Sequence, residues 1–117
     1  MHALSLYKHA MAIAQGPCFH FMALTCTQNQ INASRLIRGD EQGVQIHFPR
    51  LFHWIKSTGS DTFAVAYNHP SGNHALTQAD MTFTSQLEVA AQKEGVLLIM
   101  TMVLSPKGFA LLATRDA

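Results

Sequence analysis

The first part of the chain alternates apolar and polar positions in a way that predicts one helix followed by two strands. Residues 3–14 carry apolar side chains at helical spacing: Leu4, Tyr7, Met11 and Ala14. Residues 18–27 are mostly apolar and suit a strand that is covered on both faces. After a polar turn we expect an antiparallel return strand over residues 31–38, which ends at Gly39.

The middle of the chain predicts a short helix, a strand and a loop. Pro49 stands where a first helical residue would stand and Gly59 where a C-terminal cap would, so we expect a short helix between them. Residues 61–68 alternate their side chains between two faces, which indicates a strand. Residues 69–76 are polar and contain a glycine, so we interpret them as a loop.

The remainder of the chain predicts a long helix and a closing hairpin. Residues 77–94 place apolar side chains at helical spacing: Ala79, Phe83, Leu87, Ala90 and Ala91. Gly95 ends this helix, and residues 96–104 and 109–113 are apolar runs on either side of a turn. Strands interleaved with helices indicate the α/β class, with one mixed sheet flanked by helices in a single domain over residues 1–117.

Composition and charge exclude several classes of protein. Apolar residues make up 48% of the 117 residues and charged residues 13%, which suffices for a core and excludes intrinsic disorder. The formal net charge is +1 and the basic residues are scattered singly, so the sequence does not support nucleic-acid binding led by charge. Low net charge favours association, so a homo-oligomer stays open as an expectation.

The sequence also bears on the compartment of the protein. No apolar run approaches the roughly 18 residues that a membrane span needs, so we expect no membrane segment. Cys18 and Cys26 are the two cysteines, and their spacing predicts neither a CxxC site nor a disulfide framework. We interpret them as small buried side chains of a cytoplasmic protein.

The chemistry of the chain concentrates around the loop after residues 61–68. His69 begins this loop, and Asp80 follows in the first turn of the predicted long helix. Imidazole and carboxylate are ligands that zinc favours, but a catalytic zinc needs more than these two. Thr77 and Asp80 also match a capping box, which stabilises a helix start. The zinc-ligand and helix-capping interpretations both stay open, and His74, in the loop between His69 and Asp80, is the candidate for a further ligand.

Residues 67–72, which read Tyr-Asn-His-Pro-Ser-Gly, and the following Thr77-x-x-Asp80 resemble the signature of RadC-type proteins, a bacterial branch of the JAB/MPN (JAMM) metalloproteases. The family pattern is His-x-His-Pro-Ser-Gly and then Ser-x-x-Asp, preceded by a glutamate on an earlier strand. The resemblance extends over residues 17–113. It implies the JAB/MPN architecture, which is related to that of cytidine deaminases, and a zinc ion held by two histidines and the aspartate. The glutamate then activates a zinc-bound water.

The chain departs from this family pattern at the positions that carry the chemistry. Tyr67 stands in place of the first histidine, and a phenol with a pKa of about 10 is a poor zinc ligand at neutral pH. The glutamate falls at Ser34, or at Arg35 if the register shifts by one, and neither side chain serves as a base. Thr77 keeps the hydroxyl of the family's serine, which makes it the one weak catalytic candidate.

Other acids in the first part of the chain do not replace the missing glutamate. Asp40 and Glu41 follow Gly39 in a predicted loop, beyond the strand that must carry the base. Asp61 begins the strand that leads to His69, at a distance of about seven residues of extended chain. We therefore expect no upstream acid to reach the site.

Three hypotheses about function follow from these residues. The first is a RadC-like domain with an incomplete zinc site and no cofactor, which serves as a non-catalytic binding or scaffold module for a protein partner. The second is a divergent zinc-dependent hydrolase, of metallopeptidase or isopeptidase type, that uses His69, Asp80 and a substitute such as His74. The third, a DNA-repair-associated accessory protein, rests only on the family's name as DNA-repair proteins.

Overall fold

The computed structural model describes residues 2–114 and shows a mixed five-stranded sheet with helices on both faces. The predicted fold class, α/β with one mixed sheet flanked by helices, is therefore confirmed. The elements in chain order are α1 (Ala3–Ala10), the 3₁₀ helix η1 (Met11–Ala14), β1 (His20–Thr27), β2 (Gln30–Arg38), α2 (Phe48–Ser57), β3 (Thr62–Asn68), α3 (Gln78–Lys93), β4 (Leu97–Ser105) and β5 (Gly108–Thr114).

The strands lie in the order β2-β1-β3-β4-β5 across the sheet. β1 runs antiparallel to both of its neighbours, β3 and β4 run parallel, and β5 returns antiparallel to β4. A parallel pair needs a crossover connection, and α3 supplies it between β3 and β4. The loop between β3 and α3 is therefore held between a strand end and a helix start.

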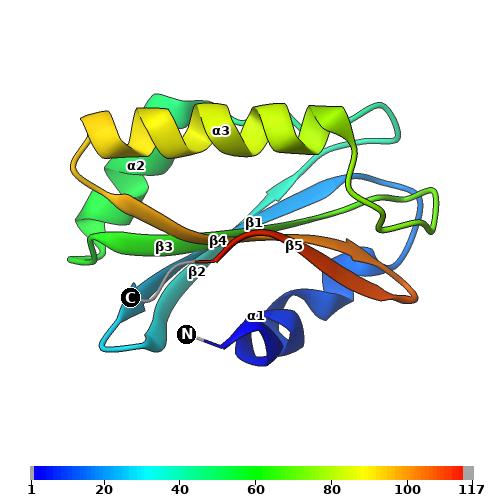
Figure 1. Ribbon diagram of the computed structural model, residues 1–117, viewed down its shortest axis with the longest axis horizontal. Helices are drawn as coiled ribbons and strands as arrows, with labels where there is room; N and C mark the ends of the chain where they lie inside the picture. The colour runs from blue at the N-terminus through cyan, green and yellow to red at the C-terminus, as the bar shows by residue number, and fades with distance from the viewer. Residues whose placement is uncertain (1, 115–117) are drawn as a thin grey trace.

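Helices cover the two faces of the sheet, with α2 and α3 on one face and α1 on the other (Figure 1). The core under α2 and α3 includes Phe21, Ala23, Phe63, Val65 and Leu98 from the strands. The core under α1 and η1 includes Leu24, Ala64, Ala66, Met100 and Met102. The alternation predicted along β3 is confirmed, because successive residues of this strand belong to opposite cores.

Only part of the apolar stripe expected over residues 3–14 faces the core. Ala14 is buried and Tyr7 packs on the core as expected, but Leu4 and Met11 are 57% and 46% exposed. The other buried residues are Leu6, Ala10 and Ile13. The α-helix ends at Ala10 and a tighter 3₁₀ helix follows, so a stripe drawn at constant helical spacing does not continue across the junction.

The buried face of α3 matches the expected stripe except at the start of the helix. Leu87 and Ala91 are buried as predicted, whereas Ala79 is exposed. Asp80 and Thr84 take the inward positions in the first half of the helix. The inward turn at the helix start brings a carboxylate, rather than an apolar side chain, against the end of β3.

Candidate functional site

The last residue of β3 fixes the start of the loop that carries the predicted site. Asn68 is fully buried, and its amide accepts a hydrogen bond from the N–H of His20 at 2.7 Å and donates one to the carbonyl of Cys18 at 3.0 Å. The N–H of His69 donates to the carbonyl of Leu104 at 2.8 Å. These bonds tie the loop to β1 and β4, so His69 leaves the sheet from a rigid support.

The loop turns back directly after His69. The N–H of Gly72 donates to the carbonyl of His69 at 3.1 Å, and Gly72 has a φ of +87°, which glycine adopts without steric cost. The carbonyl of Asn73 lies 2.9 Å from Nδ1 of His69. The side chain of Asn73 accepts a hydrogen bond from the N–H of Ala75 at 2.9 Å. The loop therefore folds around the imidazole and orients it.

α3 begins with the capping box predicted for Thr77 and Asp80. Oγ1 of Thr77 accepts a hydrogen bond from the N–H of Asp80 at 3.2 Å, and Oδ2 of Asp80 accepts one from the N–H of Thr77 at 2.8 Å. The carboxylate also lies at the positive end of the helix dipole. The capping role of both residues is thus confirmed, and it aims Asp80 at the end of β3.

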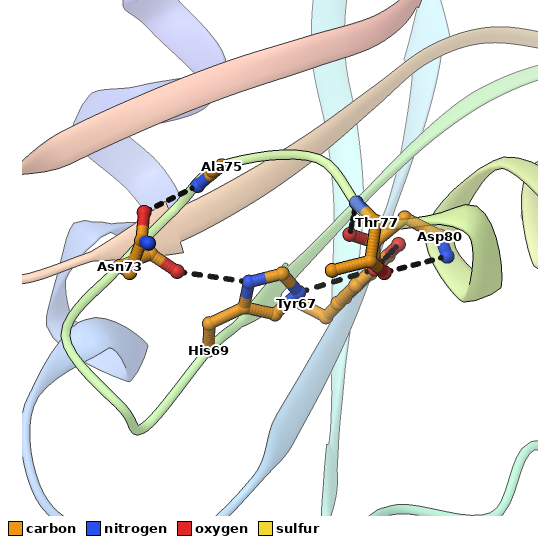
Figure 2. Close-up of polar contacts among 6 residues, drawn as sticks. All are labelled: Tyr67, His69, Asn73, Ala75, Thr77 and Asp80. Atoms are coloured by element: carbon orange, nitrogen blue, oxygen red, sulfur yellow. Dashed lines mark hydrogen bonds and ion pairs between the residues drawn. The ribbon is translucent and has the colours of Figure 1, made fainter.

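Tyr67, His69 and Asp80 meet in one hydrogen-bonded cluster (Figure 2). The hydroxyl of Tyr67 donates to Oδ1 of Asp80 at 2.8 Å, and Nε2 of His69 lies 3.1 Å from the same oxygen. Asp80 is 5% exposed. With the N–H of Thr77 on Oδ2, three donors from the protein surround this buried carboxylate.

These contacts determine the charge states of two groups in the cluster. Burial by itself would raise the pKa of Asp80, but hydrogen bonds from Thr77, Tyr67 and His69 outweigh it and lower the pKa below its ordinary value. Burial, the hydrogen bond to Asp80 and the charge of Asp80 all raise the pKa of Tyr67. At neutral pH the cluster therefore holds a carboxylate and a protonated phenol.

Both ring nitrogens of His69 face hydrogen-bond acceptors. Nδ1 faces the carbonyl of Asn73, and Nε2 faces the carboxylate of Asp80. A neutral imidazole carries one N–H, so it satisfies only one of the two contacts.

A cleft of about 630 Å³ opens beside the cluster. Its apolar lining consists mainly of Phe19, Phe21, Val44, Ile46, Pro70 and Phe83. Tyr67, His69 and Asp80 contribute its polar wall together with Ser71 and Thr77. The cleft can therefore hold an apolar group that ends close to a small set of hydrogen-bonding groups.

The strand expected to carry the catalytic base does not bring one to this cleft. Ile37, Phe21 and Tyr67 stand side by side across β2, β1 and β3, so the position of β2 that is level with the cluster is an isoleucine. Ser34 and Arg35 are exposed residues further along β2, and neither lines the cleft.

Glu41, from the loop after β2, contributes to the lining of the cleft, whereas the structure shows no contact of its carboxylate with His69 or Asp80. The loop folds tightly because the N–H of Asp40 donates to the carbonyl of Gly43 at 2.9 Å, and Oδ1 of Asp40 accepts from the N–H of Gln42 at 2.8 Å. The signal in the sequence was the pair of glycines, Gly39 and Gly43, around Asp40. Asp61, by contrast, lines a separate hollow near the β1–β2 turn, as expected from its distance.

The ligand set in the cleft does not fit the zinc ion that the family implies. His74, the candidate substitute, is turned away, with Nδ1 2.8 Å from Oγ of Ser105 at the end of β4. Within residues 2–114, no three His, Cys, Asp or Glu side chains converge in a way that suits a metal ion. The structure brings His69 and Asp80 together as predicted, but Tyr67 joins them as a proton donor and not as a third ligand.

This arrangement defines the class of protein. One mixed sheet lies between α1 and the pair α2 and α3, and a cleft at the end of β3 contains the His-Pro-Ser-Gly loop and a capping aspartate. These are features of a JAB-type α/β domain. The model of the RadC-like JAB domain family matches residues 1–116, so the chain belongs to that family. The family resemblance inferred from the motif is confirmed.

Several bacterial relatives support the family assignment. A UPF0758 protein of Streptococcus suis is 28% identical over 92 residues, which are 77% of this chain and 37% of that protein. A UPF0758 protein of Gloeothece citriformis is 34% identical over 71 residues, 60% of this chain and 29% of its own length. A UPF0758 protein of Enterococcus faecalis is 29% identical over 84 residues, which are 71% of this chain and 36% of that protein. The chain thus spans about a third of the length of these relatives.

The helices of the structure also bear on the expected absence of a membrane segment. No helix in the described part of the chain is long and apolar enough to cross a bilayer.

Proposed function

We propose that this RadC-like JAB domain is a non-catalytic binding module, and that its cleft receives an apolar segment of a partner protein without the help of a metal ion. The observation that carries the proposal is the convergence of the Tyr67 hydroxyl and Nε2 of His69 on one oxygen of Asp80. These three residues occupy the positions at which the family pattern has its metal ligands. Here they bind one another.

The energetics of the cluster argue against metal binding at this position. A zinc ion on Oδ1 of Asp80 would have to displace the two side-chain contacts to that oxygen, and hydrogen bonds to charged groups contribute about 1.5–3 kcal/mol each. It would also need Tyr67 to lose its proton or to move away from Oδ1. Burial and the adjacent carboxylate oppose loss of the proton from Tyr67.

The cleft also lacks a base in a position to activate water. The family's glutamate corresponds to Ser34 or Arg35, and both lie outside the cleft. Glu41 lines the cleft from an exposed loop, but its carboxylate forms no metal-binding group with His69 and Asp80. A general base acts only within hydrogen-bond reach of the proton that it removes. The mainly apolar lining favours binding of an apolar segment over hydrolysis.

Metal analysis of the purified protein tests this proposal. The wild-type chain, the variant Tyr67→His and a matched variant, Tyr7→His, are purified from zinc-supplemented medium, and zinc per chain is measured by plasma mass spectrometry. We expect well below one zinc per chain in the wild type and in Tyr7→His. Tyr67→His restores the family's His-x-His pattern, so it should gain zinc, because it removes the competing phenol and supplies a third ligand.

Two results would contradict the proposal. One is a tightly bound zinc ion at one per chain in the wild type. The other is zinc-dependent cleavage of a peptide or isopeptide substrate that is abolished in Asp80→Asn, a variant close to the native shape, while Asp61→Asn retains it. That second result would establish the divergent hydrolase. If Tyr67→His gains no zinc, Tyr67 is not the residue that excludes the metal.

A further inference from the structure

A second concave surface lies away from the cleft, between strand β2 and helix α2. Its lining, which we call the α2–β2 groove, consists of Arg35, Pro49, Arg50, His53, Trp54 and Ser57. The groove has a volume of about 470 Å³ and shares no lining residue with the cleft. It is therefore a separate surface, and its properties do not depend on the proposed role of the cleft.

The groove gathers basic residues that are far apart in the sequence. Arg35 projects from β2 on the side of α2, since its partner in β1 is Ala23, which belongs to the core under α2 and α3. Arg50, His53 and Trp54 come from one face of α2, at the spacing of neighbouring helical positions. No acidic residue lines the groove. Along the sequence the basic residues are scattered singly, so only the fold brings these together.

The two arginines have no carboxylate partners within residues 2–114. The ion pairs of that part of the chain are Lys56 with Glu94 and His69 with Asp80. The first turn of α2 contains no acidic residue either. An arginine presents donors that match a carboxylate in a bidentate geometry. The groove therefore suits an acidic ligand.

The groove also lies beside a free edge of the sheet. β2 is an edge strand of nine residues, and no described segment pairs with its outer side. An extended polypeptide that adds to such an edge forms backbone hydrogen bonds and places alternate side chains on each face. Those on the α2 side would enter the groove, next to Arg35. β5, the other edge, has no charged residue over residues 108–114 to select a ligand.

We propose that the α2–β2 groove and the free edge of β2 together bind an extended acidic segment of a partner protein. Glutamate or aspartate side chains pair with Arg35 and Arg50, and an apolar side chain packs on Trp54. Tryptophan and arginine are the residues that most often dominate binding energy at protein interfaces. A polypeptide fits better than a nucleic acid, because only a polypeptide continues the backbone pairing of the sheet.

Fluorescence titration provides a direct test, because Trp54 is the one tryptophan of the chain. The full chain is titrated with a synthetic peptide of repeating Glu-Thr-Val-Thr, which places glutamate and valine in turn on one face of an extended strand, and the emission of Trp54 is followed. Two control peptides accompany it: one with lysine in place of glutamate, and one with N-methyl groups on alternate amides to block strand pairing. With the acidic peptide we expect a saturable change in emission, and added salt should weaken the binding. With either control peptide we expect no saturable change.

Three charge variants locate the binding surface. Arg35→Gln and Arg50→Gln should each weaken binding by about tenfold, since each removes a charge-assisted hydrogen bond. Arg38→Gln is the matched control: Arg38 is also exposed on β2, but its partner in β1 is His20, one position away from the core residue Phe21, so it points to the opposite face. The affinity of Arg38→Gln for the acidic peptide should stay within about twofold of the wild-type affinity.

Several outcomes would overturn the proposal. If the emission of Trp54 shows no saturable change up to millimolar peptide, the groove is not a binding site. An equal loss in Arg38→Gln would indicate general charge attraction rather than the groove. Equal binding of the N-methylated peptide would exclude pairing with β2. Tighter binding of an oligothymidylate than of the acidic peptide would assign the groove to nucleic acid instead.

Discussion

Replacement of Tyr67 by phenylalanine tests whether the Tyr67–His69–Asp80 cluster holds the site together. The substitution removes one hydroxyl and leaves the ring, which packs edge-on against Phe83 with centroids 5.8 Å apart. It deletes the 2.8 Å hydrogen bond to Oδ1 of Asp80 and leaves the contacts from His69 and Thr77 in place. Asp80 is buried, so water does not freely replace the lost donor.

The expected loss follows from the charge and burial of Asp80. A hydrogen bond to a charged group contributes about 1.5–3 kcal/mol, and the two remaining donors favour the lower part of that range. We expect Tyr67→Phe to lower the free energy of unfolding by about 1.5 kcal/mol at pH 7. Denaturant unfolding measures this loss, with Tyr7→Phe as the matched control. The ring of Tyr7 packs on Phe109, and its hydroxyl bonds to no described residue, so the control should change little.

The pH dependence gives a second, independent readout. Hydrogen bonds lower the pKa of Asp80 in the folded state below its value of about 4 in the unfolded chain. The stabilisation by Asp80 is therefore present above about pH 4, and it is lost as the pH falls through the lower, native pKa. Tyr67→Phe removes part of that lowering. The stability difference between wild type and variant should therefore shrink below about pH 4.

Either of two observations would refute this reasoning. If Tyr67→Phe is no less stable than Tyr7→Phe at pH 7, the hydroxyl does not contribute to the fold. If the variant is less stable by an amount that stays constant down to pH 2, the loss comes from packing and not from the Asp80 carboxylate.

Three smaller perturbations test the supports of the site. Thr77→Ala removes the N-cap of α3 and should lower the free energy of unfolding by about 1 kcal/mol in denaturant melts. His74→Ala breaks the 2.8 Å contact with Ser105, so amide exchange across the loop should accelerate while α2 is unaffected. Gly39→Ala places a Cβ against the carbonyl of Gly43 and 2.7 Å from Cβ of Val44. This crowding should lower the free energy of unfolding by roughly 1–3 kcal/mol, as measured by thermal melts.

Local patterns predicted most of the fold because each of them records a physical constraint that acts over a few residues. The alternation along residues 61–68 identified the strand β3, and Thr77 with Asp80 identified the start of α3. The stripe over residues 3–14 failed at Leu4 and Met11 because burial there depends on a change of helix type at Ala10 and on where the sheet offers an apolar surface. Neither is a local property.

The candidate site was predicted in part for the same reason. The proximity of His69 and Asp80 follows from the strand–loop–helix order, and the structure places them 3.1 Å apart. The sequence identified Tyr67 only as a missing ligand, because its contact with Asp80 depends on how α3 packs over β3. The place of Glu41 in the cleft depends on the close approach of Gly39 to Gly43, which no hydrophobic pattern encodes.

The substitution at position 67 and the proposed loss of the metal have a common structural logic. In the family pattern, a zinc ion would join the end of β3 to the start of α3 through its ligands. Without the ion, the buried carboxylate facing the end of β3 keeps only the contacts from His69 and Thr77, and a buried charge with too few donors is destabilising. A tyrosine at position 67 supplies a further donor, because its hydroxyl reaches Asp80 and raises the number of side-chain donors on Oδ1 to two. Under the proposed function, the tyrosine that disfavours zinc is therefore also the residue that stabilises the fold without it.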